Sequence, residues 1–289
     1  MMLDHVVITE VGPRDGLQNE SIVVPLADKV RLVEELAAAG CPEVEVSAFV
    51  RPDRVPQLAD AEEVFSALSK QSGTMYSALV PNLQGFDRAC AAGAEKVSLF
   101  TAASDTFSMR NTNTSVAGTI ERFSPVVKAA TLRGIPVRVY VSCVVACPFE
   151  GRISPEQVAS VVQQVVALGD VEVDLGDTIG AAKPSDIDPL VLAMRPFVDV
   201  DHMVLHLHDT HGGAVECARR AIELGVRRFD ASCGGLGGCP FAPGAPGNVA
   251  TGDMVTLCHE MGYDTGIDPA QLAATSRWIR NLLCCGNTD

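Results

Sequence analysis

Short runs of β-branched residues alternate with helical patterns along the chain, and this alternation restricts the possible folds more than any other feature. Eight such runs are bounded by Gly, Pro, Asp or Asn, and several are continuous apolar stretches typical of strands covered on both faces. Because alternating strands and helices build a parallel sheet, eight units predict an α/β fold closed into a (β/α)8 barrel, with an open doubly wound sheet as the weaker alternative. The expected strands are Val6–Val11, Val44–Ala48, Met75–Val80, Val97–Thr101, Val137–Ser142, Val171–Leu175, Met203–His208 and Arg228–Ser232.

The helical patterns between the runs carry matching start and stop signals. Ser154 precedes Pro155, as expected for a capping serine and a proline in the first turn. Five segments end on a glycine that suits the left-handed residue closing a helix. These glycines are Gly40, Gly93, Gly134, Gly169 and Gly225, and the clearest helical patterns are Ala27–Ala39, Ile120–Arg133, Pro155–Leu168 and Ala214–Leu224.

The length of 289 residues fits one barrel, since such barrels commonly take about 250 residues. We therefore expect a single domain over 1–289, with the barrel over about 5–268 and an extra C-terminal helix and tail over 269–289. No Gly-x-Gly-x-x-Gly motif follows the first strand, which argues against a dinucleotide-binding sheet.

Composition excludes several partners. A net charge of −14 argues against nucleic acid and anionic membrane surfaces, and no apolar run is long enough to span a bilayer. The ten cysteines are scattered without zinc-type spacing, and no secretory signal is apparent at the N-terminus, so we expect reduced thiols in a cytoplasmic protein. A substrate with phosphates would need a local basic patch. Loop residues Arg51, Arg54, Arg110, Arg152 and Lys183 could supply it, although plain solvated charges are the alternative.

The segment 205–210, Leu-His-Leu-His-Asp-Thr, is the strongest functional signal. Side chains two apart on a strand point to the same side, so His206 and His208 project together from the end of the seventh expected strand. Two satisfied polar residues at a strand end are the alternative interpretation. Because other polar residues also follow strands, we favour a pair of metal ligands.

The carboxyl ends of barrel strands meet at one face, where barrel enzymes place their active sites. Arg14 and Asp15 follow the first expected strand, Glu45 lies on the second, and Asp177 follows the sixth. Imidazole with oxygen ligands suits Mg²⁺ or Mn²⁺, with Zn²⁺ or Co²⁺ as alternatives. Cys239 lies in a glycine-rich loop long enough to act as a lid, where its thiol could transfer a proton or play no part.

The chain resembles the hydroxymethylglutaryl-CoA lyases over roughly residues 5–268. The resemblance rests on several motifs, including the run from Glu10 to Glu20, Cys147-Pro-Phe-Glu-Gly151, Leu175-Gly-Asp-Thr178, His206-Leu-His208-Asp-Thr210 and the Gly-Gly-Cys239-Pro loop through Asn248. It implies a metal-dependent carbon–carbon lyase that cleaves a 3-hydroxy-3-methylacyl-CoA to acetyl-CoA and a keto acid such as acetoacetate. It also implies an acyl-CoA partner and a homodimer.

The same resemblance assigns roles to individual residues. It implies a divalent cation held by Asp15, His206, His208 and Asn248. It implies Arg14, Asp177 and Cys239 as catalytic residues, with Glu45 supporting them and Asp177 or His206 as the base. It places Gln18, Ala48, Asp174 and Thr178 at the substrate.

Four positions depart from the pattern of that family, namely Ser21, Ala48, Asp174 and Gly252. Ala48 and Asp174 replace two serines thought to hold the distal carboxylate of the substrate. The substitutions lead us to the hypothesis of an intact metal site beside a rebuilt acyl pocket, for which citramalyl-CoA, cleaved to acetyl-CoA and pyruvate, is an alternative substrate. A condensing synthase on the same barrel, or a barrel that only binds CoA, are the less favoured alternatives.

Overall fold

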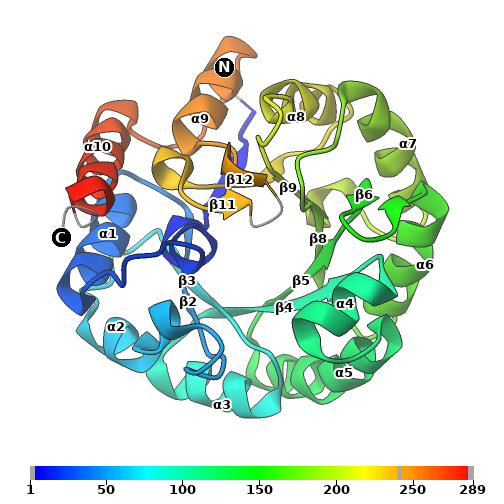
Figure 1. Cartoon of the computed structure of the whole chain (residues 1–289), viewed down its shortest axis with the longest axis horizontal. Coiled ribbons are helices and arrows are strands. Elements are labelled where there is room, and N and C mark those ends of the chain that lie inside the picture. Colours follow the sequence, from blue (N-terminus) through cyan, green and yellow to red (C-terminus); the bar gives the residue numbers. More distant parts are fainter. Residues whose placement is uncertain (1–3, 240–241, 286–289) are drawn as a thin grey trace.

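The computed structural model describes residues 4–239 and 242–285, of which residues 238–239, 242–246 and 285 are described by backbone alone. Eight parallel strands close into a barrel (Figure 1), in the order β1-β10-β9-β8-β5-β4-β3-β2. This confirms the predicted (β/α)8 barrel. The strands are β1 (Val7–Glu10), β2 (Glu43–Ala48), β3 (Met75–Leu79), β4 (Lys96–Ala102), β5 (Val137–Ser142), β8 (Glu172–Asp177), β9 (Met203–Leu207) and β10 (Arg228–Ala231).

Helices surround the barrel, and the predicted C-terminal helix is present as α10 (Pro269–Cys285), which packs against the first helix. The others are α1 (Leu26–Ala38), α2 (Ala61–Ala67), α3 (Leu83–Ala92), α4 (Asp105–Thr112), α5 (Val116–Arg133), α6 (Pro155–Val166), α7 (Pro184–Met194), α8 (Ala214–Glu223) and α9 (Thr251–Glu260). None of the helices in the described part of the chain is long and apolar enough to cross a membrane.

The predicted helix boundaries rest on capping chemistry that the structure contains. The Ser154 hydroxyl accepts a hydrogen bond from the Gln157 amide, and the Gln157 side-chain oxygen accepts one from the Ser154 amide, which forms a complete capping box. All five predicted closing glycines have positive φ, from +66° at Gly134 to +150° at Gly169. The five helices before these glycines therefore end one to three residues ahead of the predicted closing residue.

Short elements that the sequence did not predict lie at the ends of the barrel strands. Two hairpins pair β6 (Ala146–Cys147) with β7 (Gly151–Arg152), and β11 (Gly238–Cys239) with β12 (Ala242–Pro246). The short helices are η1 (Gly12–Gly16), η2 (Pro56–Leu58), η3 (Val200–His202) and η4 (Cys233–Gly235), of which η1 is a π-helix.

The barrel interior differs from the prediction of continuous apolar strands. In β5, Val137, Val139 and Val141 belong to the hydrophobic core, whereas the alternating Arg138 is buried among the ionised side chains of other strands. Lys96 on β4 is 2% exposed and forms an ion pair with Glu43 of β2. The strands thus turn apolar residues toward the helices and charged residues toward the barrel axis.

Candidate metal centre and active site

Three side chains from two parts of the barrel converge at its mouth. Asp15 lies in η1, directly after β1, and His206 and His208 lie at the end of β9. Their candidate ligand atoms all lie within 4.8 Å of one another. The convergence predicted from the sequence is therefore present, and a single ion could contact all three side chains.

The carboxylate of Asp230 orients the His206 ring. Its Nδ1 lies 3.1 Å from Oδ2 of Asp230 on β10, which leaves Nε2 as the atom available to a metal. Burial opposes the charged imidazolium, but the Asp230 hydrogen bond and the charge of Asp15 outweigh burial and raise the pKa of His206. A carboxylate bound to the second ring nitrogen is the usual support of a metal-ligating histidine.

His208 has the properties of a ligand without a competing partner. Its buried Nδ1 has no hydrogen-bond partner among the described residues. Burial, reinforced by the neighbouring His206, lowers the pKa of His208 to about 4, so the ring is neutral at physiological pH. A neutral, unpartnered imidazole beside a carboxylate fits a divalent cation, because only the neutral ring can donate its lone pair.

Asp15 is held from two sides. Arg14 Nη1 lies 2.5 Å from its Oδ1, and the Asn248 amide nitrogen donates to its Oδ2 at 2.9 Å. Burial would raise the pKa of Asp15, but Arg14 and the two histidines lower it well below its usual value, so the carboxylate stays ionised. A Cβ at Gly237 would lie 2.7 Å from the Asn248 amide nitrogen, so this close approach requires glycine. Asn248 thus stands at the predicted place, and its Oδ1 is the atom that could coordinate a cation.

Arg14 is fixed by Glu45 and Tyr140. Its Nε donates to Glu45 Oε2 at 2.5 Å, the Tyr140 hydroxyl donates to the same oxygen at 3.1 Å, and the guanidinium lies 5.1 Å from the Tyr140 ring centre. Burial works against the charge, yet Glu45 and Asp15 raise the pKa of Arg14, so it remains a cation. The guanidinium retains N–H groups beyond these two bonds that could face a substrate oxygen.

Asp177 ends β8 at the same face of the barrel. Its two carboxylate oxygens accept the amides of Ala181 and Ala182 at 3.0 and 2.9 Å. Burial raises the pKa of Asp177 to about 6 against these hydrogen bonds, which suits a group that exchanges protons near neutrality. The adjacent Thr178 is half-buried, and its hydroxyl accepts the Cys143 amide at 2.8 Å.

Ala48 and Gln18 border this group of residues. Ala48 is buried at the end of β2 in a small apolar cluster with Leu58, Leu79 and Tyr140, separate from the main core. Gln18 is half-buried one helical turn after Arg14. The departure at Ala48 therefore puts a methyl group beside Tyr140, and Tyr140 in turn contacts Arg14.

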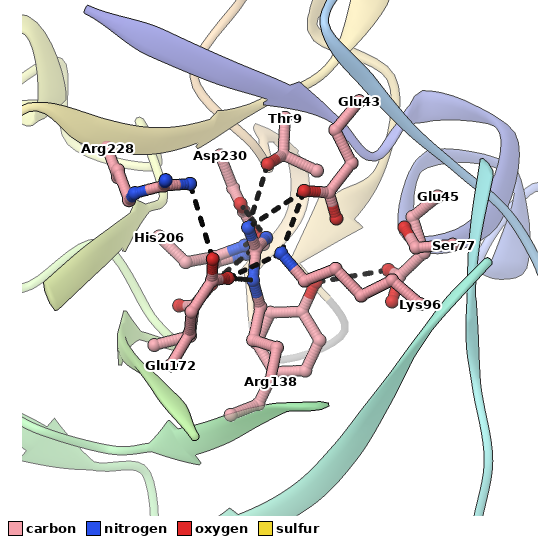
Figure 2. Close-up of polar contacts among 12 residues, drawn as sticks. Thr9, Glu43, Glu45, Ser77, Lys96, Arg138, Glu172, His206, Arg228 and Asp230 are labelled. Carbon is pink, nitrogen blue, oxygen red and sulfur yellow. Dashed lines mark hydrogen bonds and ion pairs between the residues drawn. The ribbon is translucent and has the colours of Figure 1, made fainter. Parts of the chain in front are cut away.

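Asp174 does not reach the exposed side of the mouth. It is 0% exposed, its Oδ2 lies 3.7 Å from Arg138 Nη1, and it lies close to Asp230 and His206. Figure 2 shows the buried charges around Arg138, which donates to Asp230, Thr9 and Glu172. The structure thus places Asp174 with these interior charges, beneath the candidate metal ligands.

The supporting residues Asp230, Tyr140 and Arg138 were not predicted from the sequence, although a signal was present. In β5, β8 and β10 charged or aromatic residues alternate with apolar ones, as at Arg138 and Tyr140 or at Arg228 and Asp230. Such alternation indicates two different faces of a strand. We predicted only that several strands are continuous apolar or β-branched stretches, and we did not use this alternation.

Other predicted residues have local partners. Arg51 pairs with Asp53 at 2.8 Å, Arg152 forms an ion pair with Asp186, and Arg110 stacks 4.1 Å from the Phe149 ring centre. The cysteines whose side chains are described are free thiols. The backbone of Cys239 lies in β11, and its side chain is outside the described part of the structure.

Comparison with known proteins agrees with this geometry. Residues 5–279 match the profile of the HMGL-like family. The chain is 48% identical to hydroxymethylglutaryl-CoA lyase of Pseudomonas mevalonii, covering 92% of this chain and 88% of that protein. It is 46% identical to the mitochondrial hydroxymethylglutaryl-CoA lyase of Gallus gallus, covering 96% and 94%. The crystal structure of the HMG-CoA lyase from Brucella melitensis superposes with a TM-score of 0.95 at 46% identity, covering 96% of this chain and 99% of that one.

Proposed function

The chain belongs to the HMGL-like family and is a carbon–carbon lyase, and we propose that it cleaves a 3-hydroxy-3-methylacyl-CoA of the hydroxymethylglutaryl type to acetyl-CoA and acetoacetate. The observation that carries the proposal is the convergence of Asp15, His206 and His208 within 4.8 Å, beside a buried arginine. We infer that this group holds Mg²⁺ or Mn²⁺, with Asn248 as a fourth ligand through Oδ1.

Each residue at the barrel mouth has its own role in the proposed reaction. A divalent cation bound there supplies a Lewis acid toward the oxygens of the substrate. Asp177 accepts the proton of the C3 hydroxyl, with His206 as the alternative base only where its Nε2 is not bound to the metal, after which the C2–C3 bond breaks and the hydroxyl carbon becomes a carbonyl. Arg14, kept charged and oriented by Glu45, stabilises negative charge that develops on the oxygens.

The remaining product is a thioester enolate that needs a proton at its α-carbon. We infer that the Cys239 thiol delivers this proton when the glycine-rich loop covers the site. Gln18 and Thr178 border the same space and would orient the substrate. The base gains one proton from the hydroxyl and Cys239 gives one to carbon, so the enzyme returns to its starting state once the base has released its proton and the Cys239 thiolate has taken one up.

The acyl group is the second part of the proposal. Hydroxymethylglutaryl-CoA is the favoured substrate because the relatives carry that name. Citramalyl-CoA is the second candidate, because Ala48 offers no hydroxyl to a distal carboxylate and lies in an apolar cluster. The abundance of free thiols also favours a reducing, cytoplasmic compartment. A homodimer, which gel filtration would test, remains a prediction from the resemblance.

Acetyl-CoA release after removal and return of metal tests the proposal. The protein is treated with EDTA, dialysed, and assayed with both thioesters before and after addition of Mg²⁺, Mn²⁺, Zn²⁺ or Co²⁺. We expect no release without metal and recovery with Mg²⁺ or Mn²⁺, with hydroxymethylglutaryl-CoA cleaved faster. Metal-independent release would refute the metal role, and absence of release under every condition would indicate a barrel that only binds CoA. Faster cleavage of citramalyl-CoA would replace the favoured substrate.

A further inference from the structure

One buried carboxylate that the proposed chemistry does not use lies directly behind the metal centre. Glu10, the last residue of β1, is 0% exposed. Its Oε1 accepts the amides of Gly12 at 2.8 Å and Cys233 at 2.7 Å, and its Oε2 accepts the Thr251 hydroxyl at 2.6 Å. The carboxylate thus joins three chain segments that are far apart in sequence.

Each of these segments leads to a residue of the proposed site. Gly12 begins η1, which carries Asp15. Thr251 begins α9 and follows Asn248, the residue that donates to Asp15, by three positions. Cys233 begins η4, from which the chain enters the glycine-rich loop. One side chain therefore fixes the bases of both oxygen-ligand segments and of the loop that carries Cys239.

The surrounding packing leaves this junction little freedom. A Cβ at position 12 would lie 2.6 Å from Glu10 Oε1, so only glycine allows the amide to approach. Thr251 is 0% exposed, and its amide donates to the Ser232 carbonyl at 3.1 Å. Burial raises the pKa of Glu10 to about 7 against its hydrogen bonds, so a neutral side chain of the same shape is a fair replacement.

We propose that Glu10 is a positioning residue of the metal centre, which sets the place of Asp15 and Asn248 through its hydrogen bonds to Gly12 and Thr251. It touches neither substrate nor metal. The inference rests on the proposed metal site. In it, Glu10 fixes the segment that carries Asp15 relative to the segment that carries Asn248. His206 lies on β9 and His208 directly follows it, and neither hydrogen-bonds to Glu10 itself, although the backbone of the Asn248 segment also pairs with that of the histidine segment.

Mn²⁺ affinity, followed by the electron paramagnetic resonance of the free ion at mildly alkaline pH, measures this role without turnover. Glu10→Leu removes both acceptor oxygens and with them all three hydrogen bonds, whereas Glu10→Gln keeps Oε1 for the two amides and presents Nε2 to the Thr251 oxygen. Thr251→Val removes one hydrogen bond with little change of shape. Thr74→Val is the matched control, because its buried hydroxyl donates to the Cys41 carbonyl just before β3, at the opposite end of the strands.

We expect the Mn²⁺ dissociation constant to rise about 10- to 100-fold in Glu10→Leu, the range found for supporting residues of metal sites. Thr251→Val should cost about fivefold, and Glu10→Gln and Thr74→Val should stay within about threefold. A folded Glu10→Leu protein with wild-type affinity would overturn the proposal. If Glu10→Leu does not fold, Thr251→Val decides in the same way by comparison with Thr74→Val. Failure of the wild-type protein to bind Mn²⁺ would instead refute the metal centre itself.

Discussion

The barrel mouth and the barrel interior both contain clusters of charged side chains, but these charges have different partners in the two regions. At the mouth, His208 is neutral with a free ring nitrogen, and the Asp15 side chain is 19% exposed. In the interior, Arg138 and Lys96 are at most 2% exposed and pair with Glu43 and Glu172 (Figure 2). The interior charges thus neutralise one another, whereas the mouth offers lone pairs that a cation could use.

This difference shows why a cluster of charges does not by itself identify a functional site. Ion pairs in a dry interior contribute mainly by compensating one another, and removing one partner leaves the others uncompensated. A metal site instead needs ionised or neutral ligands that keep a lone pair accessible to the cation, whatever other hydrogen bonds orient them. Variants in the interior should therefore affect folding, and variants at the mouth should affect metal binding and activity.

The largest effect is expected in the interior, for Arg138→Met. The substitution leaves the carboxylates of Asp230, Glu172 and Glu43 without their shared cation, which should cost about 3–5 kcal/mol of unfolding free energy. Urea unfolding of the metal-free protein measures the loss. Arg133→Met is the control, since its pair with Asp87 is half-exposed and should contribute no more than about 1 kcal/mol. Equal losses in both variants would contradict the distinction between interior and surface charges.

At the mouth, we expect the opposite of the Arg138→Met result, because His208→Ala should reduce metal binding far more than stability. The metal-free protein should lose less than about 1 kcal/mol, because the Nδ1 of this ring has no partner to lose. Mn²⁺ affinity and acetyl-CoA release should fall more than about 100-fold, beyond the usual cost of changing a supporting residue. His202→Ala, which truncates an exposed histidine just before the same strand, should change neither quantity. Wild-type metal binding by the His208 variant would remove this residue from the site.

The two regions should also respond to acid in different pH ranges. The pKa of Asp177 is raised to about 6, so its basic form is lost below that pH and kcat/KM should fall about tenfold per unit. Burial opposes ionisation of Glu172, but Arg138 and Lys96 lower its pKa from 4.5 to about 2. A lowered folded-state pKa gives stability that is complete above the unfolded pKa of 4.5 and is lost as the pH falls toward 2.

Activity should therefore be about half its maximum near pH 6 and fall further below it, whereas the stability contributed by Glu172 is lost only below about pH 4.5. Initial rates and circular dichroism over the same pH series separate the two transitions. Asp177→Asn should lower the rate and flatten the limb near pH 6. Persistence of that limb in the variant would assign it to another group, of which His206 is the nearest candidate.

The sequence could predict the features that depend on local signals. Strand period, helix-ending glycines such as Gly134 and the paired histidines at the end of β9 each act within a few residues, and the structure contains all of them. The support of His206 by Asp230 could not be derived in this way, because those residues meet only through the pairing of β9 with β10. The inward direction of Arg138 depends likewise on closure of the barrel, although its alternation with valines marked β5 as two-faced.

Asp174 joins the two regions, and Asp174→Ser should have the smallest effect. Both of its carboxyl oxygens are buried without a hydrogen bond among the described residues, Oδ2 lies 3.7 Å from Arg138 Nη1, and burial together with the charge of Asp230 raises the pKa of Asp174 well above its usual value. Removing an unsatisfied buried carboxyl should leave the free energy of unfolding unchanged or raise it by about 1 kcal/mol. Because Asp174 lies beneath the ligands, Mn²⁺ affinity should stay within about threefold.

Ala48→Ser is the matched change at the mouth, since it adds a hydroxyl beside Tyr140 and Leu79. This hydroxyl could donate to a distal carboxylate, so kcat/KM for hydroxymethylglutaryl-CoA relative to citramalyl-CoA should rise about three- to tenfold, as expected for one new hydrogen bond to a charged group. Asp174→Ser should leave that ratio unchanged. If Asp174→Ser shifts the ratio as much as Ala48→Ser, then Asp174 acts on the substrate. It would then belong to the residues of the mouth and not to the interior charges.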